Sequence, residues 1–394
     1  MNILFSLTYY TPYISGLTLH VQMIAEALAD RGYNVSVLSM RYKDDLSVSE
    51  IVNKIRVVRA NTLFKISKGF ISFDWLVKSI KEVNQNQVVI INLPQFEGVI
   101  TALCARLFRK RIVVFYHCDV ILPSSFLNFF VQKVLYLSNY LTLFLADVIL
   151  HSTKDFADHS VVLNRFQKKL KFIYPPIKGY ILNKRAQKIL KKRIGNIDKY
   201  KVGFVGRMAA DKGLEYLLQA IPLIKIRLQN QSLIRDNHNL KSKFKVIIAG
   251  PTEPVGEESY KERINMLIEA NKGDIILLGK LKDKEMAAFY SLMDVLVLPS
   301  INSTESFGTV QVEAMMMGVP IVASDLPGVR IPVQKTGMGK IVPIRSSQAI
   351  AEAVVELFDK KGNVNTKYNI SITKKEFSIS KTVDFYEKII QANE

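Results

Sequence analysis

The sequence predicts two doubly wound α/β domains that follow one another along the chain. Short apolar, β-rich runs alternate with helical stretches, a pattern typical of parallel strands joined by crossover helices. The 394 residues exceed what one ordinary globular domain needs. The alternation breaks at Pro175 and Pro176 and then resumes. We therefore expect a first domain over residues 1–178, a second over residues 179–375, and a terminal helix over residues 376–394 that packs back on the first domain.

Apolar periodicity defines the individual elements. Residues 19–31 are expected to form a helix, because Val21, Ile24 and Leu28 recur on one helical face. Strands are expected over residues 3–7, 33–38, 88–92, 112–116, 148–151, 202–205, 245–249, 275–278, 295–298 and 320–323. Because both halves show the same alternation, each half is expected to hold one sheet.

Composition and charge limit the class of protein. Hydrophobic residues make up 48% of the chain and charged residues 23%, which is globular composition. There are only two cysteines and no clean apolar run of about 20 residues, and the first residues are expected to form a strand rather than a signal peptide. We therefore expect a cytoplasmic protein, soluble or peripheral on the inner face of the membrane. The net charge of +19 suits an anionic partner, but no recognised nucleic-acid-binding module accompanies it, so we expect no nucleic acid.

Two cations flank a predicted strand-to-helix loop in the second domain. Arg207 and Lys212 lie five residues apart, after the strand that ends at Val205. At this spacing they can converge on an anion at the helix N-terminus, where free N–H groups add to the attraction. A solvated loop with ordinary surface charges explains them equally well, since short motifs have many false matches.

A second motif places two glutamates around the start of a helix expected from Phe307 to Gly318. Glu305 precedes this helix, and Glu313 lies eight residues later, two turns inside it, which returns it to nearly the same face. One carboxylate can accept hydrogen bonds from sugar hydroxyls and the other from a ribose, leaving backbone N–H groups for phosphate oxygens. Alternatively, both glutamates are ordinary surface acids, but the apolar neighbours of Glu313 make an unpaired carboxylate costly there.

These two motifs resemble the donor site of the retaining GT-B glycosyltransferases of family 4 (group 1). The Gly-Arg…Lys-Gly loop at 206–213 and the two glutamates, with Ser-Phe-Gly after the first, carry the resemblance. The run at 278–300 is similar to the segment that leads into the glutamate motif, and 377–386 resembles the closing helix. The similarity is specific over residues 200–345 and looser over residues 1–178. It implies two Rossmann-like domains with an interdomain cleft.

The resemblance also implies a role for each motif residue. Arg207 and Lys212 would bind the diphosphate of the donor, Glu305 its sugar and Glu313 its ribose. Further donor contacts would come from Ser306, Phe307, Gly308 and Thr309, and from Gly279, Lys280 and Leu281 beside the base.

In the first domain the resemblance is less complete. Gly16 stands where the family usually shows paired glycines, and His117 stands where the family often has a histidine that contacts the donor sugar. By its chemistry alone, His117 fits a core or strand-end histidine. His20 is a weaker candidate.

Taken together, the resemblance implies a retaining transfer of a hexose-type sugar from a UDP- or GDP-linked donor to a glycan or lipid-linked acceptor, in surface polysaccharide or glycolipid synthesis. The catalytic residues would be His117, Arg207, Lys212 and Glu305. No Asp-x-Asp motif and no metal-ligand spacing of His or Cys occurs, so we expect no metal, and no cofactor besides the nucleotide sugar. The alternatives are a catalytically silent nucleotide-sugar-binding subunit of a glycosyltransferase complex and a GT-B epimerase.

The apolar stretch 126–145 allows two interpretations. Its helical stripe can be the buried face of a core helix; the stripe comprises Phe126, Phe130, Val134, Leu137, Leu141 and Phe144. However, Leu127, Phe129 and Tyr136 fall outside that stripe. With Lys133 and the nearby basic residues they can instead form a surface that faces an anionic membrane, as in a peripheral enzyme acting on a lipid-linked glycan.

Overall fold

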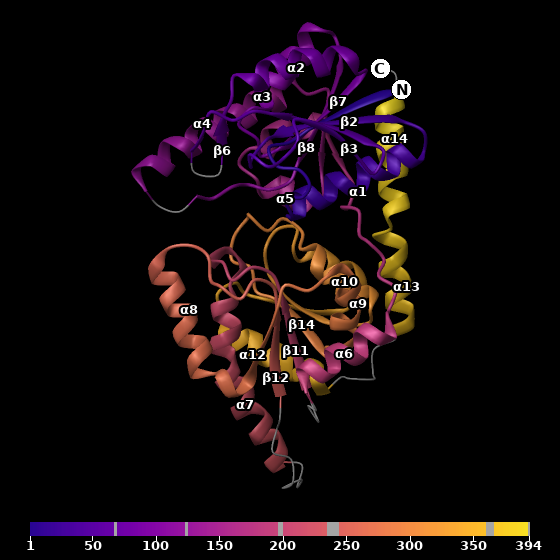
Figure 1. Cartoon of the computed structure of the whole chain (residues 1–394). Coiled ribbons are helices and arrows are strands. Elements are labelled where there is room, and N and C mark those ends of the chain that lie inside the picture. The colour runs from indigo at the N-terminus through magenta and orange to yellow at the C-terminus, as the bar shows by residue number, and fades with distance from the viewer. Residues whose placement is uncertain (67–68, 123–124, 196–199, 235–243, 360–365, 393–394) are drawn as a thin grey trace. The chain divides into compact units, whose positions relative to one another are not determined.

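The computed structural model describes residues 1–66, 69–122, 125–195, 200–234, 244–359 and 366–392. It divides the chain into two compact units, which we call unit 1 (Met1–Pro176 with Ile379–Glu394) and unit 2 (Ile177–Ser378). Each unit is built on one large β-sheet with helices on both faces (Figure 1). The prediction of two doubly wound α/β folds is therefore confirmed.

Unit 1 is built on an eight-stranded sheet. Its strands, with the separate β5–β6 ribbon, are β1 (Asn2–Ser6), β2 (Asn34–Met40), β3 (Ser49–Val52), β4 (Ile55–Ala60), β5 (Phe64–Ile66), β6 (Gly69–Ile71), β7 (Val88–Leu93), β8 (Arg111–Tyr116), β9 (Val148–His151) and β10 (Leu170–Phe172). The spatial order is β10-β9-β8-β7-β1-β2-β4-β3. Neighbouring strands are parallel except β3 and β4, which form an antiparallel hairpin.

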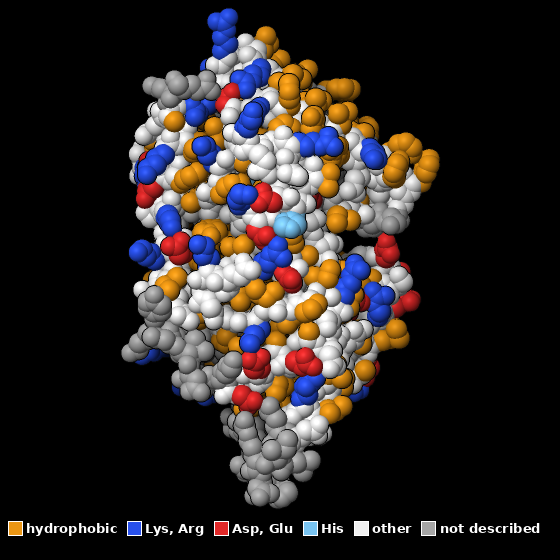
Figure 2. Space-filling view, turned by 180° about the vertical axis from the view of Figure 1, so that it is seen from behind, with side chains coloured by type: hydrophobic (Ala, Val, Ile, Leu, Met, Phe, Trp, Pro, Cys, Tyr) orange, Lys and Arg blue, Asp and Glu red, His pale blue; other side chains and the backbone are white. Residues whose placement is uncertain are grey.

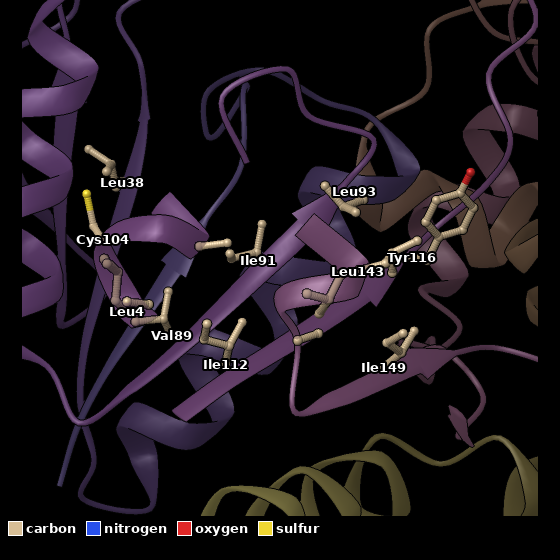
Figure 3. Close-up of a cluster of buried hydrophobic side chains, with 14 of the residues drawn as sticks. Leu4, Leu38, Val89, Ile91, Leu93, Cys104, Ile112, Tyr116, Leu143 and Ile149 are labelled. Carbon is tan, nitrogen blue, oxygen red and sulfur yellow. The ribbon is translucent and has the colours of Figure 1, made fainter. Parts of the chain in front are cut away.

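Helices cover both faces of this sheet. They are α1 (Gly16–Asp30), α2 (Asp74–Gln85), α3 (Gly98–Leu107), α4 (Phe126–Leu145), α5 (Lys154–His159), the 3-10 helix η1 (Leu163–Lys169) and α14 (Ile379–Gln391). Because side chains alternate along a strand, Ile3 and Phe5 pack in the core beneath α1 and α14, whereas Leu4 packs in the core beneath α2 to α5. Figure 3 shows part of the core beneath α2 to α5, to which Leu4 of β1, Cys104 of α3 and Leu143 of α4 contribute.

Unit 2 repeats the arrangement with six parallel strands. These are β11 (Tyr200–Val205), β12 (Phe244–Ala249), β13 (Ile275–Gly279), β14 (Val295–Leu298), β15 (Ile321–Ser324) and β16 (Gly339–Val342). The order is β13-β12-β11-β14-β15-β16.

The helices of unit 2 also pack on both faces of its sheet. The core on one face involves α7 (Leu214–Ile234), α8 (Glu258–Ala270) and α12 (Ser347–Asp359). The core on the other involves α6 (Lys184–Ile194), α9 (Asp283–Leu292), α10 (Thr309–Met316), α11 (Ile331–Thr336) and α13 (Thr366–Glu376). Two 3-10 turns complete the unit, η2 (Ala210–Lys212) and η3 (Lys272–Asp274).

The environment of α4 contradicts one prediction. The stripe that was interpreted as buried (Phe126, Phe130, Val134, Leu137, Leu141 and Phe144) is exposed along its whole length, so the core-stripe interpretation is wrong. The buried side of α4 combines Val131, Leu135 and Leu143 with three polar residues, Ser138, Asn139 and Thr142. Ser138 Oγ donates to the Phe96 carbonyl at 2.6 Å, and Thr142 Oγ1 donates to the Ser138 carbonyl at 2.7 Å. Hydrogen bonds to backbone carbonyls allow these polar groups to be buried. In the described ranges, no helix is long and apolar enough to cross a bilayer.

In both sheets the strand order reverses beside the first strand. In unit 1, β1 lies between β2 and β7, and in unit 2, β11 lies between β12 and β14. Crossovers on the two sides of such a strand leave in opposite directions, which opens a crevice at the carboxyl ends where ligands bind in this class of fold. The loops after β1, β7, β11 and β14 are therefore the places to look for a site.

Candidate functional site

In unit 2 the loop after β11 is held against the loop after β14. Lys212 is the last residue of η2, and Gly213 follows it at a φ of 63°. A Cβ at position 213 would lie 2.0 Å from the Pro299 carbonyl oxygen, so only glycine fits. The Ile301 N–H also donates to the Asp211 carbonyl at 3.1 Å. These contacts fix the position of Lys212 at the point where β11 and β14 separate.

Lys212 and Glu305 form an ion pair at this point. Lys212 Nζ donates to Glu305 Oε2 at 2.6 Å, and the two side chains are 22% and 15% exposed. Burial lowers the pKa of Lys212, but the attraction of Glu305 outweighs it, so the pKa is raised overall. Arg207, on the same loop, is half exposed, with its NH2 group 3.9 Å from Asp211 Oδ2. The structure therefore brings Lys212 and Glu305 together and leaves the Arg207 side chain facing solvent.

The start of α10 differs from the prediction. The helix begins at Thr309, two residues later than expected, because Gly308 precedes it at a φ of 75°. A Cβ at Gly308 would lie 2.4 Å from Leu298 Cδ2. Glu313 therefore lies about one turn inside the helix rather than two. The expectation that helical periodicity places Glu305 and Glu313 on one face is wrong, because residues 305–308 are not helical.

Glu313 has a buried hydrogen-bond partner that the sequence did not suggest. The hydroxyl of Tyr290 in α9 donates to Glu313 Oε2 at 2.6 Å, and Tyr290 is fully buried. Burial raises the pKa of Glu313 to about 7, against a smaller lowering by the Tyr290 hydrogen bond. The Glu313 carboxyl therefore changes its charge near neutral pH.

The other predicted donor-binding residues of unit 2 lie in two loops. Ser306 and Phe307 follow β14, and the Phe307 ring is buried, so only its backbone can meet a ligand. Gly279, Lys280 and Leu281 stand at the end of β13 and just after it; Lys280 is exposed, and Leu281 packs against the core beneath α9. This second loop lies two strands away from β11, because β12 stands between them.

The remaining two predicted residues belong to unit 1. His117 follows β8, and its Nε2 lies 3.1 Å from Asn92 Oδ1 at the end of β7. Its ring stands 4.9 Å from the ring of His20. Burial, together with His20 and His151, lowers the pKa of His117 well below its usual range, so the imidazole is neutral near pH 7. Gly16 is the first residue of α1 and is exposed.

Unit 1 also contains a cavity of about 170 Å³ beside the loops after β1 and β7. Side chains such as Tyr9, Phe96 and Val131 line it, and Gln95 adds a polar group. Gln95 is 1% exposed, and its Oε1 accepts from Ser6 Oγ at 3.2 Å. Within the described part of the chain, the Gln95 Nε2 group has no hydrogen-bond partner. A buried donor of this kind favours a ligand or water that accepts from it.

Two family models match this chain, one in each half. The model described as Glycosyltransferase Family 4 matches residues 14–178, and the model described as Glycosyl transferases group 1 matches residues 199–360. This chain belongs to the group 1 glycosyltransferases. The resemblance inferred from the motifs is confirmed, and with it the transferase activity and the GT-B fold.

Individual relatives are distant from this glycosyltransferase. An uncharacterized glycosyltransferase of Methanocaldococcus jannaschii is 25% identical over 330 residues, covering 80% of this chain and 78% of that protein. The phosphatidyl-myo-inositol mannosyltransferase of Mycobacterium leprae is 34% identical over 155 residues, which cover 39% of this chain and 36% of that protein. Anabaena HepE, solved in complex with UDP, is 19% identical with a TM-score of 0.76 and full coverage of both chains. The last comparison shows a shared fold.

Sequence reasoning missed three polar residues near the predicted groups of this glycosyltransferase. Tyr290 lies in an apolar helical segment and gave no sign of its bond to Glu313. Asn92 and Gln95 are polar residues at and just after the end of an otherwise apolar strand, and that position was the available signal. Polar residues at the carboxyl ends of buried parallel strands are candidates for ligand contacts, because ligands bind at these ends in this class of fold.

Proposed function

We propose that this group 1 glycosyltransferase moves a hexose from a UDP- or GDP-linked sugar to a glycan or lipid-linked acceptor, with retention of anomeric configuration, in surface polysaccharide or glycolipid synthesis. The observation that carries the proposal is the Lys212–Glu305 pair at the strand-order reversal of unit 2. The UDP bound in Anabaena HepE supports a nucleotide-linked donor. The phosphatidyl-myo-inositol in the name of the Mycobacterium leprae relative supports a lipid acceptor.

The groups around this pair suit a diphosphate. Lys212 uses one ammonium hydrogen on Glu305, so two remain for phosphate oxygens. Arg207, on the same loop, offers a planar guanidinium that can hold two oxygens at once. The first N–H groups of α10, which begins four residues after Glu305, have no partners within the helix. We propose that these groups, rather than a divalent metal, neutralise the charge that develops on the leaving diphosphate.

The proposed reaction is a displacement on one face of the sugar. The acceptor oxygen forms a bond to the anomeric carbon while the bond from that carbon to the diphosphate oxygen breaks. The acceptor proton passes to the leaving phosphate oxygen, so no side-chain base is needed. Glu305 would hold the sugar hydroxyls with its second oxygen, and Glu313, steadied by Tyr290, would accept from the ribose. The roles that the resemblance gives to Gly16 and His117, and to the loops 279–281 and 306–309, stay predictions.

We propose the cavity of unit 1 as the place where the acceptor binds. Its apolar walls suit a hydrophobic part of the acceptor, and the Gln95 amide can donate to one of its oxygens. Gln95→Leu fills similar volume but removes the donor. We expect it to raise KM for the acceptor about tenfold, the effect of one lost hydrogen bond in a buried site, with little change in KM for the donor.

The donor is tested by thermal shift against a panel of UDP- and GDP-linked sugars, because a ligand that binds only the folded state raises Tm. We expect one donor class to raise Tm of the wild type and to be hydrolysed slowly without acceptor. Lys212→Met is the matched control, and it should lose both responses. If no nucleotide sugar shifts Tm and none is hydrolysed, the proposed donor class is wrong.

A further inference from the structure

Three neighbouring helices of unit 1 share an unusual outer surface. Helix α3 packs between α2 and α4 on one face of the sheet (Figure 1). The Trp75 indole N–H donates to Thr101 Oγ1 at 3.1 Å, which joins α2 to α3. At Gly98, a Cβ would lie 3.3 Å from Thr142 Oγ1, so this glycine allows α3 to approach α4 closely. The three helices therefore form one continuous layer.

The outer side of this layer is apolar. We call it the α2–α4 face. Its exposed large hydrophobic residues are Phe73, Leu76, Val77 and Ile80 at α2, Leu103 and Leu107 on α3, and Phe126, Leu127, Phe129, Phe130, Val134, Leu137, Leu141 and Phe144 on α4. In Figure 2, hydrophobic side chains gather over the part of unit 1 where these helices lie, with Lys and Arg between them. An exposed apolar area this rich in Phe and Leu marks a binding surface.

Packing within the chain does not explain the composition of α4. Its buried residues are three apolar ones (Val131, Leu135 and Leu143) and three polar ones (Ser138, Asn139 and Thr142), while four phenylalanines point outward, Phe126 at 83% exposure. A helix that served only to cover the sheet would place most of its large apolar residues inside rather than outside. The outer side therefore has a function of its own.

Basic residues stand directly beside the apolar ones. Lys133 Nζ lies 5.5 Å from the centre of the Phe129 ring, and Lys169 Nζ lies 5.7 Å from the centre of the Phe144 ring. Arg165 lies 6.0 Å from the Tyr140 ring. Helices α3 and α4, which are described throughout, contain no Asp or Glu. Of the acids in or next to these helices, Asp74 binds Lys78 at 2.6 Å, Asp147 binds Arg106, and Glu82 and Glu97 are buried.

We propose that the α2–α4 face docks this glycosyltransferase on an anionic phospholipid bilayer. Apolar side chains flanked by Lys and Arg match the two layers of a membrane surface, in which acyl chains lie beneath anionic headgroups. A second copy of the chain is a poorer match. A symmetric contact would place each basic face against itself, and like charges in an interface oppose association.

Membrane docking also bears on the acceptor. Val131 and Leu135, on the inner side of α4, line the cavity proposed for the acceptor. The same helix would thus touch the bilayer with one side and the acceptor with the other. This link rests on the proposed function, whereas the docking itself does not.

The test is flotation of the full chain with vesicles of phosphatidylcholine containing a quarter phosphatidylglycerol, and with vesicles of phosphatidylcholine alone. Phe126→Ser/Phe130→Ser removes exposed apolar area, and Lys133→Glu/Arg165→Glu reverses exposed charge. The matched control is Ile51→Ser/Lys54→Glu, the same types of change on exposed residues of the β3–β4 hairpin at the far edge of the sheet.

We expect the wild type and the control to bind the anionic vesicles equally, and more strongly at low NaCl than at high NaCl. Each test variant should lower the partition coefficient at least about tenfold, and only the charge variant should lose its salt dependence. All variants should keep the wild-type Tm and the same hydrolysis of the nucleotide sugar. Hydrolysis that fails while vesicle binding persists would refute the proposed function and leave the docking intact.

Three results would overturn the docking. The first is a wild type that stays unbound at low NaCl, and the second is that the test variants bind as the control does. The third is a chain that is dimeric in solution, does not bind vesicles, and becomes monomeric in Phe126→Ser/Phe130→Ser, because the face would then be an interface between copies.

Discussion

The Lys212–Glu305 pair offers the sharpest test of the proposed site. Removing the ammonium in Lys212→Met should have two separate consequences. The fold loses the partner of a mostly buried carboxylate, and the reaction loses a charge that stabilises the leaving diphosphate. A second variant that restores stability without restoring turnover distinguishes a catalytic lysine from a structural one.

The size of each effect follows from the burial of the pair. Breaking a fully buried ion pair costs about 3–5 kcal/mol, and the residual exposure of 22% and 15% reduces our expectation for Lys212→Met to about 2 kcal/mol. For a unit of this size that is a fall in Tm of about 4–8 °C. Turnover should fall about 10²-fold or more, as it does when a preorganised charge is removed from a developing anion.

The second variant is Lys212→Met/Glu305→Gln, which removes both charges and keeps similar volumes. Replacing a buried pair by neutral groups is often close to neutral for stability, so Tm should return to within about 2 °C of wild type. Turnover should stay low. The measurements are calorimetric Tm and release of the nucleoside diphosphate. A single variant that keeps activity within about twofold, or a double variant that regains activity along with Tm, would refute the assigned role of Lys212.

Three further predictions concern charge and protonation. Excess EDTA should leave transfer unchanged, because Arg207 and Lys212 are proposed to neutralise the diphosphate; a loss that Mg²⁺ or Mn²⁺ restores would contradict this. The folded state keeps the Glu313 proton up to a pKa of about 7, so wild-type stability falls as pH rises from the ordinary pKa of the carboxyl towards 7. Relative to the wild type, Glu313→Gln should therefore become more stable by on the order of 2 kcal/mol as the pH is raised from about 4 to about 8. Melting curves in which the difference in Tm between the two proteins is the same at both pH values would disprove this. His117→Ala should lower kcat/KM about 10–100-fold, the effect of one or two lost hydrogen bonds, and an unchanged kcat/KM would remove His117 from the site.

Periodicity alone predicted most of the framework. Every strand expected from an apolar run is present, with ends within two residues of the expected ones. The strands that were missed include the β3–β4 hairpin. Half of β3 faces solvent, and the turn uses Asn53 and Lys54, both at positive φ, without the glycine that usually signals such a turn. The strand β4 is buried, but Arg56 and Arg59 interrupt its apolar residues.

The chemical groups of the site were easier to predict than their partners. Arg207 and Lys212 were predicted because they flank a strand-to-helix loop, and Glu305 because it precedes a helix, while the family resemblance implied their roles. The sequence could not show that Lys212 and Glu305 bind each other, since they stand 93 residues apart in the chain. The Tyr290–Glu313 bond was equally hidden, because it depends on how α9 and α10 approach.

The apolar stripe of α4 shows a limit of periodicity as a signal. Apolar residues that recur at helical spacing show that one side of a helix is apolar, but they do not show that the protein buries this side. The structure turns the stripe from Phe126 to Phe144 outward, and it buries Ser138, Asn139 and Thr142 by satisfying them with hydrogen bonds. The apolar side of a helix is usually assigned to the core because the outer side is assumed to face water. The outward phenylalanines of α4 have lysines beside them, Lys133 in the helix itself and Lys169 in η1, and the membrane docking proposed for this face would explain why they point outward.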